Sequence, residues 1–574
     1  MAMIDEIPNQ HNLPEFAVDG VNLPNVGFDV GESYAGSLPI GDANLGAELF
    51  YWFFPSTSEE AQTNKEILLW VTGGPGCSSV GELLQENGPL LWQPGTFAPV
   101  ANPWSWHRLT NVVWIDQPVG AGFSTGNATA RDEHDVASQF MGFWRNFVDA
   151  FALQGYKVYV TGSSYSGMYC PYIAGAMLDA ADKTYFDVSG MMIFDGTYSN
   201  PILQQDLTAA TFHDQWSNVF AFNASFKDSL RSAAQSCGYT DYLAKYLVYP
   251  ALEPQPSLPP GSLPDGSAPR PGCDLLNTFY TAATDANPCF SPYDILTVCP
   301  RKYDPLGFSD GVDFVPDGAA VYFDLPEVKT AIHAPNKTWL FCQSGNNGVE
   351  VFVNGTDDSL LSGPGSQPVL PGVIDRTQNV IIAHGARDWV LMEKGTLLML
   401  QNLTWGGKLG FESDPRSQGN ELIMPGLSDE YVSALQSAGA VVGLTAGGGR
   451  GVVGTVHAER GLTYLGVDTS GHFLSMAAPE VSFRALEVLL GRVNGFDGAE
   501  PFTVDVGFAS GVAGNGTSGA QVSYGVTGGS AMQAGPAAAS AEPVKKTSGA
   551  ERRDVGSASL LTGVVVLGCA FLTL

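Results

Sequence analysis

A serine, an aspartate and a histidine lie far apart in this chain, and each follows a short apolar run. They are Ser164, Asp388 and His472. A serine hydroxyl is a weak nucleophile until a base removes its proton, and the base in turn needs a group that orients it. The three runs are 157–162 (KVYVTG), 379–383 (NVIIA) and 464–467 (YLGV). If they are parallel strands, their carboxyl ends meet at one edge of a sheet, and the three residues can form a hydrolytic triad there.

Ser164 occupies the sharpest predicted turn of the chain. It stands in Gly162–Gly167 (GSSYSG), between a predicted strand and a predicted helix at 166–180. Such a turn holds a serine Oγ away from the sheet as a nucleophile elbow, although a serine-rich turn that merely caps a helix is the alternative. Paired glycines after another run, in 72–77 (TGGPGC), allow a second N–H to face the site. We expect Gly74 and Tyr165 to supply the oxyanion donors, because no Gly-Lys-Ser/Thr ending indicates a phosphate loop.

Other residues compete for these roles. Residues 31–36 (GESYAG) contain Ser33 in a serine motif, but no apolar strand precedes it and Ser37-Leu38-Pro39 follow it, not a helix. His384 lies beside Asp388 at the end of a strand, and His457 precedes a strand. We interpret all three competitors as structural.

The elements that position these groups alternate between apolar strands and amphipathic helices. This pattern is typical of an α/β protein with a mostly parallel central sheet and helices on both faces. We predict an α/β-hydrolase fold that carries an irregular, disulfide-bearing cap insertion. The expected parts are an N-terminal extension (1–46), a first core part (47–199), the insertion with its proline-rich loop (200–320), a second core part (321–495), a Gly/Ala/Ser-rich stalk (496–550) and a C-terminal signal (551–574).

Composition excludes several classes of protein. The 574 residues are 44% hydrophobic and 15% charged, as in globular domains. The net charge is 27 − 58 = −31, which repels phosphate backbones, so we expect no nucleic-acid partner. A clustered cysteine set suggests disulfides, and no Cys-x-x-Cys or His-x₃-His pair supports zinc, so we expect neither metal nor cofactor. That set is Cys237, Cys273, Cys289 and Cys299, whose pairing the sequence leaves open.

The C-terminal segment has the pattern of a signal for a GPI anchor. Small residues at 548–550 precede a polar spacer at 551–559 and an apolar tail at 560–574, with Ser548 as the attachment residue. A short tail-anchor helix is the alternative. The first residues (MAMIDEIPNQ) contain no leader, so we expect a truncated or misassigned start, a route through the secretory pathway, and membrane contact only through the lipid. Six glycosylation sequons agree with that route: Asn127, Asn223, Asn336, Asn354, Asn402 and Asn515.

The motifs taken together resemble the serine carboxypeptidase family, of the fungal type. They are GGPGCSS (73–79), QENGP (85–89), DQPVGAGFS (116–124), GSSYSG (162–167), GARD (385–388) and SGH (470–472), and the resemblance covers about residues 45–495. It implies a hydrolase that removes C-terminal residues from peptides, with Ser164 as nucleophile, His472 as general base and acid, and Asp388 as its orienting partner. It also implies a disulfide bond between Cys77 and Cys342. Phe473, directly after His472, is expected to line the leaving-group pocket, and a packing role is the alternative.

The chain departs from the family where the substrate's free carboxylate binds. The family has Asn before GGPG and Glu before the nucleophile, but this chain has Thr72 and Ser163, and of the carboxyls only Glu86 remains. A lone Glu86 would lack the repulsion that keeps one of two carboxyls protonated. We therefore expect intact hydrolytic chemistry with altered recognition of peptide C-termini. An esterase or acyltransferase on the same scaffold, or a catalytically impaired surface glycoprotein, is the alternative, and the oligomeric state is not predicted.

Overall fold

A single long sheet forms the centre of the molecule. The computed structural model describes residues 13–41, 46–308, 315–316, 318–342, 351–353, 355–362, 367–425 and 451–504. Within them an 11-stranded sheet has the order β1-β2-β3-β7-β4-β8-β9-β10-β15-β14-β13. In that order the strands are Ala17–Val18, Ser33–Pro39, Glu48–Phe54, Asn111–Asp116, Glu66–Val71, Lys157–Ser163, Asp187–Phe194, Val380–Gly385, Leu462–Val467, Gly451–Glu459 and Glu421–Met424.

The central strands run parallel and the outer strands run antiparallel. Parallel pairing joins β7 to β4, β4 to β8, β8 to β9, β9 to β10 and β10 to β15. Strands β2 and β3 on one side, and β14 and β13 on the other, extend the sheet in antiparallel pairs. The predicted α/β-hydrolase fold is therefore confirmed, with the carboxyl ends of β8, β10 and β15 at the same edge.

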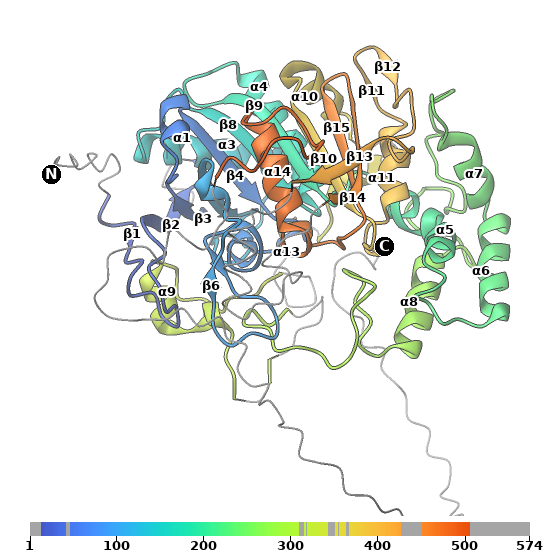
Figure 1. The fold of residues 1–574 in the computed structure, drawn as a ribbon, viewed down its shortest axis with the longest axis horizontal. Coiled ribbons are helices and arrows are strands. Elements are labelled where there is room, and N and C mark those ends of the chain that lie inside the picture. Colours follow the sequence, from blue (N-terminus) through green and yellow to red (C-terminus); the bar gives the residue numbers. More distant parts are fainter. Residues whose placement is uncertain are drawn as a thin grey trace, which may run out of the picture.

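Alternating side chains of the strands feed two hydrophobic cores, one on each face. In β3, Tyr51 and Phe53 belong to one core, and Phe50, Trp52 and Phe54 belong to the other. Helices cover both faces because each core needs an apolar partner layer (Figure 1). The first core is packed by α3 (Glu133–Ala150), α4 (Ser166–Ala180) and α10 (Leu370–Thr377), and the second by α2 (Ser79–Glu82), α9 (Pro326–Ala331), α13 (Leu474–Ala477) and α14 (Pro479–Leu489).

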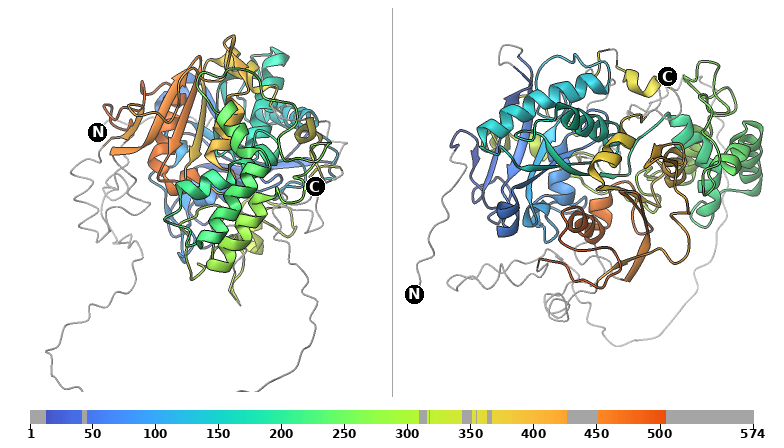
Figure 2. Two further views of the ribbon diagram at one scale, coloured as in Figure 1. Left: turned by 90° about the vertical axis from the view of Figure 1, so that its right-hand side faces the viewer. Right: turned by 90° about the horizontal axis from the view of Figure 1, so that it is seen from above.

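Part of the chain between β9 and β10, residues 207–286, leaves the sheet and forms a separate group of helices. They are α5 (Leu207–Gln215), α6 (Ala224–Ser236), α7 (Tyr239–Tyr246) and α8 (Leu275–Ala286), and they stand beside the sheet in green (Figures 1 and 2). A third hydrophobic cluster unites them and includes Trp389 from the core. Disulfides Cys237–Cys273 and Cys289–Cys299 fasten this region, which gives the pairing that the sequence leaves open.

The remaining short elements connect these layers. They are the helices α1 (Glu59–Asn64), η2 (Leu83–Asn87), η3 (Trp106–Arg108), η4 (Ile202–Asp206), η5 (Tyr322–Asp324), η7 (Asp358–Ser362) and α11 (Glu393–Leu400), and the two-residue strands β5 (Leu90–Leu91), β6 (Val100–Ala101), β11 (Thr404–Trp405) and β12 (Lys408–Leu409). Helix η2 continues directly from α2, so residues 79–87 form one helical stretch behind the loop 72–77. In the described part of the chain, every helix is too short or too polar to cross a membrane.

Candidate active site

Ser164 stands in a left-handed turn between β8 and α4. Its φ is 59°, a conformation that costs energy for any residue with a side chain and persists only where the surroundings hold it. Here Ser164 N–H donates to Phe194 O at 2.9 Å, and Thr197 N–H donates to Ser164 O at 2.9 Å. The end of β9 and the turn after it therefore hold the elbow. This is the strand–turn–helix geometry that the sequence predicts.

His472 and Asp388 form a short hydrogen bond at the same edge of the sheet. His472 follows β15 and Asp388 follows β10, and Nδ1 of the imidazole lies 2.6 Å from Asp388 Oδ2. The second oxygen of Asp388 accepts from Leu391 N–H at 3.0 Å, and both side chains are buried. Since a carboxylate only accepts, Nδ1 carries the proton and Nε2 is the basic nitrogen.

The predicted insertion (200–320) also helps to hold His472 in place, through Tyr293. His472 N–H donates to the carbonyl of Tyr293 at 2.7 Å, and the Tyr293 ring meets the imidazole edge-on with centroids 5.2 Å apart. The serine and the histidine share one sheet edge, but no hydrogen bond joins them anywhere in the described ranges. Ser164 follows β8 and His472 follows β15, and both strands end at this edge. Such bonds are often long in the absence of substrate.

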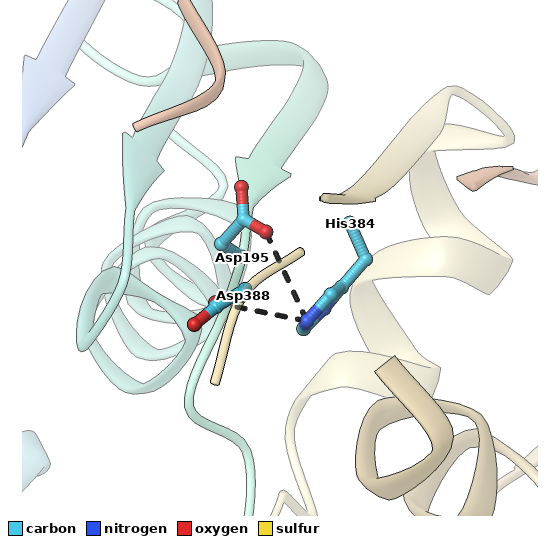
Figure 3. Close-up of side chains that lie close together, drawn as sticks. All are labelled: Asp195, His384 and Asp388. Atoms are coloured by element: carbon cyan, nitrogen blue, oxygen red, sulfur yellow. Dashed lines mark ion pairs between the residues drawn. The ribbon is translucent and has the colours of Figure 1, made fainter. Parts of the chain in front are cut away.

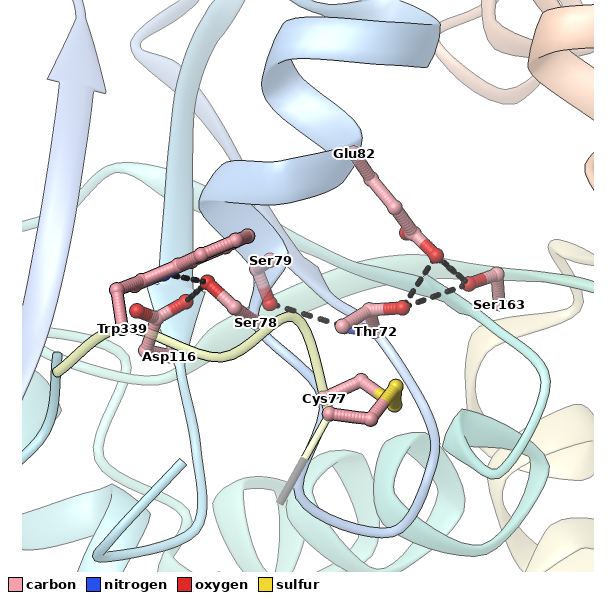
Figure 4. The surroundings of a disulfide bond; sticks show 9 residues. Thr72, Cys77, Ser78, Ser79, Glu82, Asp116, Ser163 and Trp339 are labelled. Atoms are coloured by element: carbon pink, nitrogen blue, oxygen red, sulfur yellow. Dashed lines mark hydrogen bonds between the residues drawn. A yellow bond between two sulfur atoms is a disulfide. The ribbon is translucent and has the colours of Figure 1, made fainter. Parts of the chain in front are cut away.

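The glycine loop after β4 packs directly on the elbow. A side chain at Gly73 would place its Cβ 2.2 Å from Tyr165 N and 2.9 Å from Ser164 Oγ, so only glycine fits. The loop is held from its far end by a disulfide between Cys77 and Cys342, the pair that the resemblance implies (Figure 4). Ser78 N–H also donates to Phe341 O at 2.7 Å. The loop that carries Gly74 is thus fixed against the Ser164–Tyr165 turn.

A second carboxyl stands where the sequence suggests none. Glu82 accepts hydrogen bonds from Trp70 Nε1 at 2.7 Å, from the Thr72 hydroxyl, and from the Ser163 hydroxyl at 2.9 and 3.0 Å. Thr72 and Ser163 lie 3.2 Å apart between their oxygens (Figure 4). The expectation of a lone Glu86 is therefore wrong, because Glu82 reaches the place between the two substituted positions from a different segment.

Glu82 and Glu86 are two buried carboxyls whose charges affect each other. Burial raises the pKa of Glu82, although its three hydrogen-bond donors oppose this. Burial, and next the charge of Glu82, raise the pKa of Glu86 well above its usual range. Oε1 of Glu86 is buried and has no hydrogen-bond partner among the described residues. Ser475 opposes this rise in the pKa of Glu86, but Glu82 has more donors, so the neutral form is favoured more strongly at Glu86 than at Glu82.

This pair lines a pocket beside the histidine. Its other walls come mostly from apolar side chains: Pro94, Phe308, Phe341, Phe473 and Met476, with Gln85 as a polar neighbour. The Phe473 ring meets the His472 imidazole edge-on with centroids 5.6 Å apart, so one wall of the pocket contacts the imidazole. An apolar cavity that ends in a protonated carboxyl suits a small apolar group bearing a negative charge.

The competing residues lie elsewhere. Ser33 is buried in β2, where its Oγ accepts from Trp52 Nε1 at 3.2 Å. His457 lies within β14, the strand that precedes β15, and its Nε2 pairs with Glu459 at 2.7 Å. His384 is buried beside Asp388, with its Nε2 3.8 Å from Asp388 Oδ2. It supports the candidate triad and does not replace His472.

Sequence reasoning missed two side chains and one carbonyl of this region: Glu82, Asp195 and the carbonyl of Tyr293. Glu82 could have been found, because Glu82 and Glu86 are four apart and so share a face of one helix. Asp195 follows β9, which no motif marks, and Tyr293 belongs to the insertion. Neither has a signal in the sequence.

The predicted modification sites differ in exposure. Asn127, Asn223 and Asn336 are exposed, whereas Asn402 is half-buried and accepts from Gln255 N–H at 2.7 Å. The remaining predicted sites, Asn354, Asn515 and Ser548, lie outside the described residues.

Comparison with known proteins gives a consistent result. The family model described as serine carboxypeptidase matches residues 24–492. A probable serine carboxypeptidase of Arthroderma benhamiae is 42% identical over 491 residues, which are 84% of this chain and 87% of that protein. Serine-type carboxypeptidase F of Aspergillus niger is 42% identical over 476 residues, covering 82% and 86%.

A solved structure supports the fold. The crystal structure of Kex1(Δ)p, a prohormone-processing carboxypeptidase from Saccharomyces cerevisiae, aligns with a TM-score of 0.59 at 19% identity. The alignment covers 84% of this chain and 96% of that one.

Proposed function

The chain belongs to the serine carboxypeptidase family and is a serine-type carboxypeptidase, and we propose that Ser164, His472 and Asp388 carry out its reaction. Ser164 Oγ attacks the carbonyl carbon of the last peptide bond while His472 Nε2 takes the hydroxyl proton. Asp388 accepts the Nδ1–H bond and stabilises the imidazolium. The observation that carries the proposal is the 2.6 Å bond between His472 and Asp388 at the edge where Ser164 stands in its left-handed turn.

The proposed oxyanion donors are the N–H groups of Gly74 and Tyr165. They belong to the two segments that pack against each other at Gly73, and they would face the carbonyl oxygen as it gains charge. His472 then gives its proton to the leaving amino group, and the acyl group stays on Ser164. Water, deprotonated by His472, releases the shortened peptide and restores the serine.

Recognition of the substrate's free carboxylate is proposed to depend on Glu86. As the neutral acid it donates a hydrogen bond to one carboxylate oxygen, through the oxygen that has no other partner in the described structure. Glu82 helps to keep Glu86 protonated, and the hydroxyls of Thr72 and Ser163 hold Glu82. We therefore propose that this chain keeps a second carboxyl at the recognition site. Glu82 supplies it from a helix, in place of the family's Glu before the nucleophile. The apolar pocket wall, Phe473 included, favours substrates with an apolar last residue.

Two measurements test this function. A fluorophosphonate probe should label the purified protein but not Ser164→Ala, and equal labelling of both would reject Ser164 as the nucleophile. Peptides of one sequence with a free or an amidated C-terminus should then differ sharply in cleavage. Equal cleavage would favour an esterase or acyltransferase, and a protein that neither reacts with the probe nor cleaves any peptide would be the impaired glycoprotein.

The proposed location is the secretory pathway, with a GPI anchor at the cell surface. Three disulfides in the described residues, together with the exposed Asn127, Asn223 and Asn336, support passage through an oxidising compartment. The anchor itself is proposed from the sequence pattern around Ser548 alone. Cells that express the full chain should release it on treatment with phosphatidylinositol-specific phospholipase C. Retention after treatment would reject the anchor.

A further inference from the structure

A second layer of buried ionisable side chains lies behind Asp388. Asp195 follows β9, and His384 is the last but one residue of the neighbouring strand β10. Nε2 of His384 lies 3.8 Å from Asp195 Oδ1 and 3.8 Å from Asp388 Oδ2, and all three side chains are fully buried (Figure 3). No step of the reaction described above uses Asp195 or His384.

His384 is held as a neutral imidazole of one tautomer. Its Nε2 lies 2.5 Å from Leu391 O, which can only accept, so the proton is on Nε2. Thr396 Oγ1 then donates to Nδ1 at 3.1 Å. Burial lowers the pKa of His384, in agreement with a neutral ring. Since Leu391 N–H donates to Asp388 Oδ1, His384 and Asp388 together close the turn 388–391.

Asp195 has only one hydrogen-bond donor. Its Oδ1 accepts from Gly385 N–H at 2.7 Å, whereas its buried Oδ2 has no partner in the described residues. Burial first, and then the charge of Asp388, raise the pKa of Asp195 well above its usual range, and Glu86 and Glu393 act in the same direction. Asp388 by contrast has two donors, Leu391 N–H and His472 Nδ1–H. Of two close buried carboxyls, the one with more donors keeps the charge.

Two carboxylates and an imidazole that lie close together can also bind a metal ion, and Asp195, His384 and Asp388 are such a group. Their ligand atoms lie within 4.8 Å of one another. However, both oxygens of Asp388 and both nitrogens of His384 are already engaged in the bonds given above. Only Asp195 Oδ2 is left as a ligand, and one donor atom does not make a site for a structural or catalytic cation.

We propose that Asp195 and His384 are positioning residues of the triad. Asp195, as a neutral acid, confines the negative charge of the cluster to Asp388, and His384 holds the turn that presents this charge to His472. The inference rests on the proposed role of Asp388. In the free enzyme the pair Asp195 and Asp388 then carries one proton and one charge. Loss of that proton at higher pH would leave two negative charges, on Asp195 and on Asp388, side by side in the protein interior.

The central test is Asp195→Asn, which keeps the shape and the acceptor for Gly385 but cannot ionise. With an ester substrate, which needs no carboxylate recognition, kcat/KM of the variant should stay within about 3-fold of the wild type at acidic pH, and the acid limb of the profile should not move. If Asp195 were ionised, its removal would move that limb by about one pH unit or more, because a second charge beside Asp388 would add to the field that raises the basicity of His472. Such a shift would overturn the proposal.

The pH dependence of thermal stability tests independently whether Asp195 carries a proton in the folded protein. The folded pKa of Asp195 is raised above the unfolded value of about 3.9, so above that pH the unfolded chain releases this proton while the folded chain keeps it, and stability falls as pH rises. The Tm of Asp195→Asn minus that of the wild type should therefore increase from pH 4 to pH 7. A difference that is constant over this range would show that Asp195 ionises normally and would overturn the proposal.

Matched variants test the positioning role. Asp195→Leu is uncharged but cannot accept from Gly385, and it should lower kcat about 10- to 100-fold with KM unchanged, whereas Asp195→Asn should not. Likewise His384→Gln, which keeps an N–H donor for Leu391, should retain more of kcat than His384→Leu. Rates are normalised to sites titrated with the fluorophosphonate, so unfolded protein does not count. Equal rates within either pair would refute positioning.

Asp388→Asn separates a failure of the proposed function from a failure of the roles proposed for Asp195 and His384. Asp388→Asn should lower kcat by several orders of magnitude if Asp388 orients His472. If Asp388→Asn is fully active, the proposed function itself fails. If Asp388→Asn is inactive but Asp195→Leu and His384→Leu turn over like the wild type, only this inference fails.

Discussion

Replacing Glu86 by Gln should change how cleavage of free peptides depends on pH. In the wild type, neutral Glu86 donates to the substrate carboxylate, and its pKa is raised by burial and by Glu82. As pH rises through that raised pKa, Glu86 becomes an anion and repels the substrate. Glutamine presents an N–H donor at every pH. We therefore expect kcat/KM of Glu86→Gln to remain within about 10-fold of the wild type in acid and not to fall on the alkaline side.

The size of the wild-type fall follows from the site. A carboxylate bound at hydrogen-bonding distance places its charge about 4 Å from that of ionised Glu86, and at an effective dielectric constant near 20 the repulsion is about 4 kcal/mol. That corresponds to roughly a 1,000-fold loss of kcat/KM between the two protonation states. Glu82→Gln removes one of the two causes of the raised pKa, so it should move the same fall to lower pH without abolishing it.

The assay compares one peptide with free and amidated C-termini across pH, by product mass. Amidated peptide lacks the charge and reports His472 alone, so it should show no alkaline fall in any variant. Glu487→Gln, which changes a buried carboxyl of α14 bonded to Thr503, is the matched control and should leave both profiles as in the wild type. An alkaline fall that persists in Glu86→Gln would refute the assignment of the proton to Glu86. So would a loss above 100-fold at every pH.

Three further predictions concern the elements around the site. Gly73→Ala puts a Cβ within 3 Å of Tyr165 N and Ser164 Oγ, so the backbone must shift, kcat should fall about 100-fold or more and Tm should fall as well, and a rate near that of the wild type would contradict the packing of this loop. Paired serines at Cys77 and Cys342 should lower kcat as well as Tm, whereas paired serines at Cys237 and Cys273 should lower Tm alone, as thermal melts and titrated rates can show. Burial raises the pKa of Asp206 to about 7, so its folded form prefers the proton, and stability is lost as pH rises from about 4 through 7. Asp206→Asn should therefore gain Tm over the wild type at pH 7 but not at pH 4, and an equal difference at both would reject the shift.

The fold and the proposed triad could be predicted because their signals are local. Each of the residues Ser164, Asp388 and His472 follows an apolar run that forms a buried strand, and parallel strands bring their carboxyl ends together. The carboxyl pair could not be predicted as easily, because Glu82 reaches Ser163 across 81 positions of the sequence. Comparison with the family at matched positions therefore predicts a lone Glu86. The spacing of Glu82 and Glu86, four residues apart, indicates that both lie on one face of the same helix.

The layer behind Asp388 is harder still to predict. Asp195 is placed by the pairing of β9 with β10, and its proton depends on which donors reach which oxygen. Strand pairing of this kind is decided by the whole sheet, so a sequence pattern near Asp195 carries no trace of it. The burial of two carboxyl groups side by side is a property of three-dimensional packing.

The carbonyl of Tyr293 has a practical consequence for protein engineering. Grafting the helices α5–α8 from a relative is an obvious route to new substrate preference, since they form a module with its own apolar centre. The graft, however, must end before residue 289, because the loop bridged by Cys289 and Cys299 contains the carbonyl to which His472 N–H donates. A chimera with a later junction would exchange part of the catalytic support together with the recognition surface.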